Sequence, residues 1–458
     1  MGDLSVPLIP AQKETLWQAE MAIVKLAGPS ILSFILQFLV EIINMFFIGN
    51  IDIERLDGIG LGNMWGNFIG VAVGWGLAGG LDTLCSQANG NKQYEMVGIW
   101  LQRGVVVLTV AFIPITVAIL YTAEVLMLMG VEEKIAEYSY NYLSCVLPGL
   151  WFFLCFDFFR RYLQAQEYFW PGLVVNGITT TLHVFWCWLF IIECDWLEKG
   201  AGIATSVTYI SNFVVMVALI KYFKLEQKTC KSCNFQNFWH DIRKFLRYAL
   251  PSAGMLLLDQ LNFEITQVEA SHLGVKTQAA HVAVANTVTT LYMIPLGLGI
   301  SITSIVGNFV GEGNSAKAKL YSWAALMLFF LTNFPLEVLV LTFREPLSQL
   351  YTYDTEVSEI IAKLFIPVML FNAIDFFQVV LCGVLKGIAR QSIAFIMILI
   401  SYYVFAIPGG YLMAFHADFD IYGIWYGLVI GATMATITLS YLAWKSRWAA
   451  VTLEKSMD

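Results

Sequence analysis

Charged residues are scarce in this chain of 458 residues, because Asp, Glu, Lys and Arg together make up only 13% of it. A water-soluble protein of this length needs a far more charged surface, so the composition excludes an ordinary soluble enzyme or binding domain. Apolar residues account for 58% of the chain, and its mean hydropathy is +0.68. The sequence therefore predicts a polytopic membrane protein.

Several motifs that would point to other functions are also missing. No GxxxxGK[ST] loop occurs, so we expect an ion gradient, not ATP, to supply the energy. No nucleophile–base pair or set of metal ligands is apparent, so we expect neither an enzyme nor a metal nor a cofactor. The net charge of −8 argues against nucleic acid as a partner. Residues 1–20 lack the apolar core of a cleavable secretion signal.

Cysteine usage excludes a disulfide framework. The eight cysteines are scattered and mostly fall in apolar segments, as expected for reduced thiols packed inside a membrane protein. Cys230 and Cys233 form a single CxxC pair, and only His240 lies near them in the sequence. Zinc would need a further ligand, so this pair is interpreted as part of an ordinary loop.

Apolar stretches long enough to cross a bilayer recur along the whole chain. Twelve spans are predicted, at residues 24–48, 58–80, 101–123, 136–159, 170–192, 201–222, 248–272, 280–304, 320–343, 360–384, 392–415 and 422–444. If the N-terminus is cytoplasmic, 20 of the 26 Lys and Arg residues lie on the cytoplasmic side and 6 on the other. Because cytoplasmic loops carry the excess of Lys and Arg, both termini are expected in the cytoplasm.

The spans divide into two similar halves. The predicted organisation is an N-terminal cytoplasmic tail, a six-span N-lobe, a basic cytoplasmic loop, a six-span C-lobe and a short C-terminal tail, at residues 1–22, 23–222, 223–247, 248–445 and 446–458. The Pro-Ser pair at 29–30 matches that at 251–252, and Pro148 matches Pro367 at a similar offset. The predicted fold is therefore an all-α membrane protein. Its two lobes are related by a pseudo-twofold axis along the membrane normal, and a substrate cleft lies between them.

Carboxylates inside the predicted spans are the strongest functional signal, because an acid in hydrocarbon is costly unless it faces a cavity, a partner or a proton. Asp259 and Glu264 lie on the seventh span and Asp375 on the tenth. Asp259 and Glu264 point about 140° apart on a regular helix. Either one faces the cleft and the other the lobe interior, or the helix unwinds near Pro251. We expect these acids to bind proton and substrate, although each would also serve as a structural hydrogen-bond partner.

A second acidic site is possible in the first half. Glu41 is followed one turn later by Asn44, and Asp157 lies on the fourth span. These residues form either a second site or separate inter-helix hydrogen bonds. His183 lies in the middle of a span, where a packed histidine is commoner than a proton relay. The remaining candidates for the cleft lining are Asn286, Tyr292 and Gln378.

Short motifs spread over residues 20–445 resemble those of one family. They are LDTLCSQANGNK at 81–92, RYLQAQ at 161–166, LYMIP at 291–295, GNFVGEGN at 307–314 and GVLKG at 383–387. Together they resemble the multidrug and toxic compound extrusion (MATE) transporters, in particular the plant-like eukaryotic branch. The resemblance implies a V-shaped pair of six-helix lobes and cation-coupled efflux of organic compounds. It also implies that Asp259, Glu264 and Asp375 occupy the family's coupling positions.

We therefore expect a proton-coupled antiporter that exports organic cations, or other small xenobiotics and metabolites, by alternating access. Proton and substrate would compete for the same acids. The expected setting is a monomer in the lipid bilayer of the plasma membrane or the vacuole. Three alternatives stay open: sodium coupling, export of anionic or neutral metabolites, and flipping of lipid-linked sugars. An anionic substrate or a flippase would need Lys and Arg along the cleft, and the predicted spans carry almost none.

Overall fold

The computed structural model describes residues 14–49, 51–229 and 241–450. Within these ranges every regular element is a helix. Cys230, Cys233 and the distal parts of both predicted tails lie outside the described residues.

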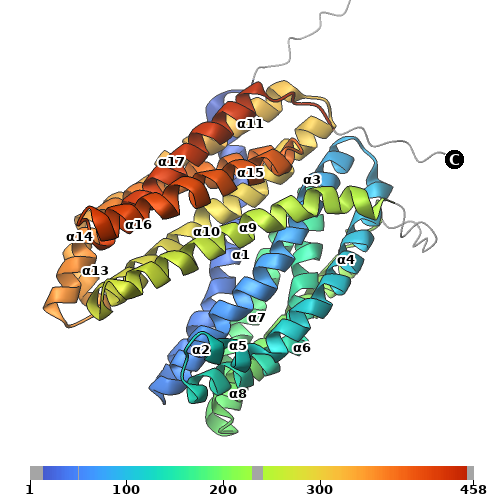
Figure 1. The fold of residues 1–458 in the computed structure, drawn as a ribbon. Helices are drawn as coiled ribbons and strands as arrows, with labels where there is room; N and C mark the ends of the chain where they lie inside the picture. Colours follow the sequence, from blue (N-terminus) through green and yellow to red (C-terminus); the bar gives the residue numbers. More distant parts are fainter. Residues whose placement is uncertain (1–13, 50, 230–240, 451–458) are drawn as a thin grey trace, which may run out of the picture.

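The first half of the chain forms one helical bundle (Figure 1). Its elements are α1 (Leu16–Gly49), α2 (Ile53–Gly66), η1 (Asn67–Val71), α3 (Ala72–Gly90), α4 (Tyr94–Leu120), α5 (Thr122–Leu128), α6 (Glu133–Ala165), α7 (Trp170–Cys187), η2 (Trp188–Glu193) and α8 (Leu197–Tyr222). The π-helical segments η1 and η2 are continuous with their neighbours, so that Ile53–Gly90 and Trp170–Glu193 are each one long span.

The second half repeats this arrangement. Its elements are α9 (Ile242–His272), α10 (Val275–Gly311), α11 (Ser315–Met327), α12 (Phe329–Thr342), α13 (Arg344–Tyr351), α14 (Thr355–Gly387), α15 (Gln391–Ile400), η4 (Ser401–Ala406), α16 (Ile407–His416) and α17 (Ile421–Lys445). The segments Ser315–Thr342 and Gln391–His416 each make one span from shorter helices.

Eleven of the described helices are long and apolar enough to cross a membrane. The remaining predicted span, the seventh, is α9, whose 31 residues are long enough but contain three carboxylates and three basic residues. The acids that made this helix a functional candidate in the sequence also lower its hydropathy. The helix begins at Ile242, inside the segment that the sequence assigns to the loop between the lobes.

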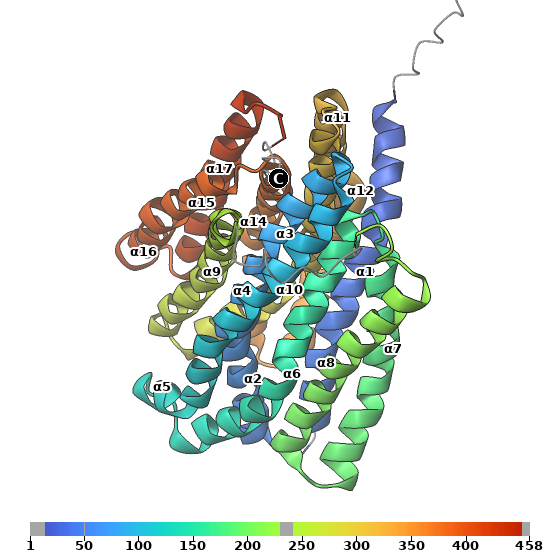
Figure 2. The same cartoon turned by 90° about the vertical axis from the view of Figure 1, so that its right-hand side faces the viewer.

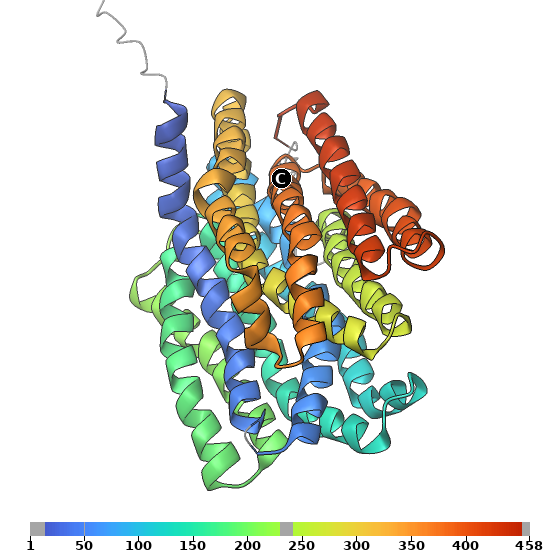
Figure 3. The same cartoon turned by 90° about the vertical axis from the view of Figure 1, so that its left-hand side faces the viewer.

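Two apolar cores correspond to the two lobes, and two helices contribute to both. Ala19 and Ile23, at the start of α1, pack in the core of the second half. Phe245 and Tyr248, at the start of α9, pack in the core of the first half. Figure 3 shows α1, the blue helix, beside α11 at its start and beside the green helix α7 at its end. Figure 2 shows α9 between the red helices and α4. This reciprocal exchange ties the lobes together.

The lobes meet along a seam on the side predicted to face the cytoplasm, where α3 packs against α9 and α10. We define the seam by residues 76–90 of α3, 249–253 of α9 and 304–311 of α10. A Cβ added at Gly90 would lie 2.8 Å from the carbonyl carbon of Asn308, so only glycine permits this approach. Toward the opposite end the two bundles diverge into a V (Figure 1).

Hydrogen bonds between the lobes lie along the seam and also join α3 to the end of α14. The hydroxyl of Thr83 donates to the carbonyl of Lys386 at 2.9 Å, and the amide of Gln87 donates to the carbonyl of Gly387 at 2.8 Å. The side chain of Asn89 donates to Asn308 Oδ1 at 2.8 Å. All three bonds join neutral groups, so each contributes only modestly to holding the seam closed.

Candidate functional site

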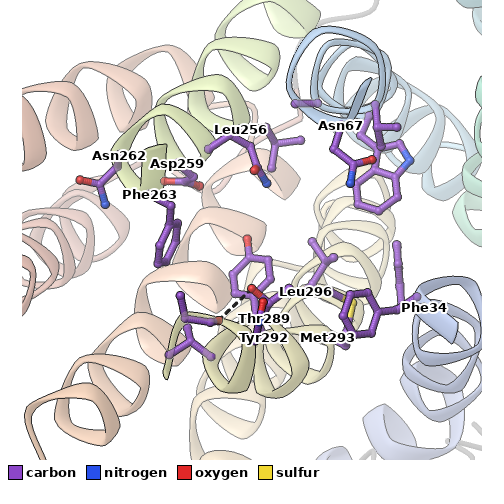
Figure 4. A pocket seen from close by; sticks show the side chains of 18 of the residues that line it. Phe34, Asn67, Leu256, Asp259, Asn262, Phe263, Thr289, Tyr292, Met293 and Leu296 are labelled. Carbon is purple, nitrogen blue, oxygen red and sulfur yellow. Dashed lines mark hydrogen bonds between the residues drawn. The ribbon is translucent and has the colours of Figure 1, made fainter. Parts of the chain in front are cut away.

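A cavity of about 310 Å³ lies between the lobes, on the open side of the seam (Figure 4). The N-lobe contributes side chains from α1, η1, α3, α6 and α8, and the C-lobe contributes side chains from α9, α10, α14 and η4. In Figure 4, Phe34 and Asn67 lie on one side of the space, and Asp259 and Asn262 lie on the other. The two walls therefore belong to parts of the protein that can move relative to each other.

Both predicted acids of α9 line this cavity. Asp259 and Glu264 are joined there by Leu256, Asn262 and Gln267 of the same helix. The helix is continuous through Pro251. The expectation that one acid turns away or that the helix unwinds is therefore wrong. A wide arc of α9 faces the cavity at the mouth of the V, so positions about 140° apart both reach it.

Asp375 reaches the same cavity from α14 and is only 7% exposed. Asn286 and Tyr292 of α10 line it too, as the sequence predicts. Tyr402 of η4 was not predicted, because a tyrosine in an apolar span gives no functional signal without its neighbours. Three carboxylates from two helices thus share one space with hydrogen-bonding side chains.

Gln378 lies behind the wall of the main cavity. It accepts a hydrogen bond from Tyr402 Oη at 3.0 Å and lines a second space of about 40 Å³. Asp259, Tyr292 and Lys386 also border this small space. It is large enough for about one water molecule. Gln378, which was predicted to line the cleft, therefore contacts the main cavity only through its hydrogen bond with Tyr402.

Glu41 lines the opposite wall, on α1. Its carboxylate accepts a hydrogen bond from Asn67 Nδ2 at 3.2 Å. Around it the N-lobe wall is largely aromatic, and the rings of Phe34 and Trp75 meet edge to face at 5.5 Å. An acid beside aromatic faces is a favourable environment for an organic cation.

Asn44 and His183 do not reach the cavity. Both side chains are fully buried inside the N-lobe. Asn44 Nδ2 donates to Thr205 Oγ1 at 2.8 Å, and the ring nitrogens of His183 lie 2.8 Å from Thr208 Oγ1 and 3.2 Å from Asn44 Oδ1. These contacts satisfy both side chains locally. The placement of His183 in the cleft lining is therefore wrong.

Asp157 also lies apart from Glu41. It is 1% exposed and forms ion pairs with Arg160 and with Arg161, whose Nε lies 2.7 Å from the carboxylate. Arg161 in turn pairs with Asp82 of α3. The predicted grouping of Glu41, Asn44 and Asp157 is thus not formed. Instead, Asp157 neutralises buried arginines next to the seam.

The cavity has a marked charge asymmetry. Four carboxylates line it, whereas Lys, Arg and His are absent from the described residues of its wall. Coulomb attraction across a space of low dielectric constant favours a positively charged occupant. In the described ranges no group of three or more His, Cys, Asp and Glu side chains is arranged to hold a metal ion.

Comparisons with known proteins identify the family. The MatE family model matches residues 29–189 and 251–412, one copy in each half of the chain. Protein DETOXIFICATION 16 of Arabidopsis thaliana is 30% identical over 98% of this chain and 92% of its own length. Multidrug and toxin extrusion protein 1 of Xenopus tropicalis is 28% identical over 94% of this chain and 75% of its own length.

Solved structures agree with this result. The crystal structure of the eukaryotic MATE transporter AtDTX14 superposes with a TM-score of 0.89, covering 94% of this chain and 97% of that one, at 24% identity. The predicted all-α, two-lobed membrane fold is thereby confirmed. The chain is an integral, multi-pass membrane protein that belongs to the MATE family of multidrug and toxin extrusion transporters, and not an enzyme.

Proposed function

We propose that this MATE transporter exchanges protons for organic cations, and that Asp259, Glu264 and Asp375 bind both. The observation that carries the proposal is the convergence of these acids on one cavity whose described wall has no basic residue. If proton and organic cation compete for the same acids, their exchange requires no long-range coupling pathway.

The exchange follows from opening the cavity alternately to the two sides. In the state described here the seam is closed and the lobes diverge on the other side, which the distribution of Lys and Arg assigns to the outside. Protonation of the acids from that side removes the attraction for a cation, and the substrate leaves. When the seam opens instead, loss of protons to the cytoplasm restores the negative site. Both termini then lie in the cytoplasm.

Two observations bear on the alternatives. An anionic substrate would leave the carboxylates of the cavity unpaired, so its export is disfavoured. Sodium would use the same carboxylate oxygens, and it is separated from protons only by experiment. The relatives named for detoxification and for multidrug and toxin extrusion support a broad range of organic substrates.

The test uses proteoliposomes with an acidic interior, choline in place of sodium, and a fluorescent organic cation outside. We expect the wild-type protein to accumulate the cation as protons leave, and Asp375→Asn to abolish accumulation. Glu359→Gln is the matched control, because it removes an exposed carboxylate that pairs with Lys363 on the same helix. Its accumulation should equal that of the wild type.

Three results would overturn the proposal. Accumulation that appears only when sodium is added would assign coupling to sodium. Wild-type activity in Asp375→Asn would remove that acid from the shared site. Failure of the wild-type protein to accumulate any of several organic cations would reject the substrate class.

A further inference from the structure

Both walls of the cavity carry carboxyl groups. Asp259 and Asp375 belong to the C-lobe, whereas Glu41 is the only carboxylate that the described part of the N-lobe contributes. Glu41 therefore reaches the cavity from a different lobe than the other carboxylates do. The space that a substrate would occupy lies between the two walls.

Glu41 differs from the other buried acids of its lobe. Asp82 and Asp157 are neutralised by arginine side chains. Among the described residues no Lys or Arg forms an ion pair with Glu41, and its hydrogen-bond donor is the neutral amide of Asn67. A carboxylate that borders a cavity without a protein counter-ion is a favourable partner for a cationic ligand.

The neighbours of Glu41 favour an organic cation over a small ion. Phe38 lies one turn before it on α1 and lines the same wall, as do Phe34 and Trp75. Aromatic faces attract quaternary nitrogen and flat heteroaromatic cations. The wall therefore combines a counter-ion with a surface on which a ring can stack.

We propose that Glu41 is a specificity-determining residue that binds the second charge of dicationic substrates. The inference rests on the proposed function, because the first charge would be held by Asp259 and Asp375. The cavity has a volume of about 310 Å³ and is lined from both lobes, so it has room for a two-ring molecule that reaches from one wall to the other. A monocation of the same shape would engage only one wall fully.

The experiment compares two probes that share a two-ring frame and differ by one charge. N-methyl-4-phenylpyridinium is the monocation, and N,N′-dimethyl-4,4′-bipyridinium is the dication. The measured quantity is the ratio of kcat/KM for the dication to kcat/KM for the monocation, in proteoliposomes with an acidic interior. Using this ratio cancels differences in the amount of active protein.

Glu41→Gln keeps the volume of the side chain and an acceptor for Asn67 but removes the charge. We expect it to lower the ratio about tenfold, the effect of losing one partly buried charge pair. Glu41→Asp should retain most of the dication preference. Glu20→Gln, which removes an acid of α1 that does not line the cavity, should leave the ratio unchanged.

An unchanged ratio in Glu41→Gln would overturn the inference, whether both probes keep the wild-type kcat/KM or lose it by the same factor. Equal losses would indicate that Glu41 acts as a proton site or a structural group. These outcomes are distinct from failure of the proposed function, which would appear as wild-type uptake of the monocation that ignores the pH gradient. If Glu41→Gln does not purify as a folded protein, Glu41→Asn is compared with Glu41→Asp, because these two side chains have nearly the same shape and differ in charge. A lower ratio in Glu41→Asn is expected, and equal ratios would overturn the inference.

Discussion

Replacing Asp157 by asparagine should destabilise the N-lobe without altering the chemistry of the cavity. Asp157 is 1% exposed, and within the described residues it is the only carboxylate that forms an ion pair with Arg160. Arg161 keeps Asp82 as a second partner. Asparagine has nearly the same shape but no charge, so the variant leaves one buried guanidinium without a counter-ion.

The size of the effect follows from that uncompensated charge. Removing one partner of a buried ion pair costs about 3 to 5 kcal/mol. For a lobe of roughly 200 residues, each kcal/mol lowers the melting temperature by about 2 to 4 °C, so the fall should be roughly 6 °C or more. The rings of Phe34 and Phe156 lie 4.1 Å and 5.8 Å from the Arg160 guanidinium and offset part of the loss.

The assay is the melting of the detergent-purified protein, followed by the amount that remains monodisperse after heating. Arg160→Met combined with Asp157→Asn removes both charges together, so the double variant should recover most of the lost stability. Glu124→Gln, which removes an exposed acid, serves as the control. The reasoning is refuted if Asp157→Asn melts like the wild type but no longer transports, because Asp157 would then be a coupling acid.

Two further predictions concern the seam and a helix start. Gly90→Ala should hold the seam open, because its Cβ would press on the backbone of Asn308 at a cost of about 1 to 3 kcal/mol. Distances between spin labels on the two lobes report this shift, and Gly177→Ala, whose Cβ would meet no atom within 4 Å, should show none. Asp354→Ala should lower the melting temperature at neutral pH, because backbone N–H groups at the start of α14 hold the pKa of Asp354 below its usual range. Since a lowered pKa stabilises the folded state fully only above the usual Asp range, the difference from the wild type should shrink as the pH falls below that range and through the lowered pKa of the folded protein. Equal differences at all pH values would contradict the assignment.

Hydropathy was sufficient to predict the helical membrane fold, because spanning segments must satisfy their backbone hydrogen bonds internally. The repeat of the Pro-Ser pair indicated two related halves. The glycine seam was not predictable, because a glycine in the sequence does not reveal which backbone it approaches. Gly90 and Asn308 are more than two hundred positions apart, and only the folded chain brings them together.

The sequence predicted some residues of the candidate site correctly and misplaced others. Rules for intramembrane acids drew attention to Asp259, Glu264 and Asp375, all of which line the cavity. The same rule misplaced Asp157, although arginines three and four residues later already offered it partners on the same helix face. Asn67, the donor to Glu41, was missed because an uncharged amide in a span carries little signal by itself.

The most direct test of the central claim is proton release on substrate binding. Adding an organic cation to purified protein in a weakly buffered solution near neutral pH, with a pH indicator present, measures whether the two cations compete for one site. We expect that binding releases protons, that the release shrinks in Asp375→Asn, and that it is unchanged in Glu359→Gln. Saturable binding of the cation with no proton release at any pH between 5 and 8 would contradict a shared carboxylate site.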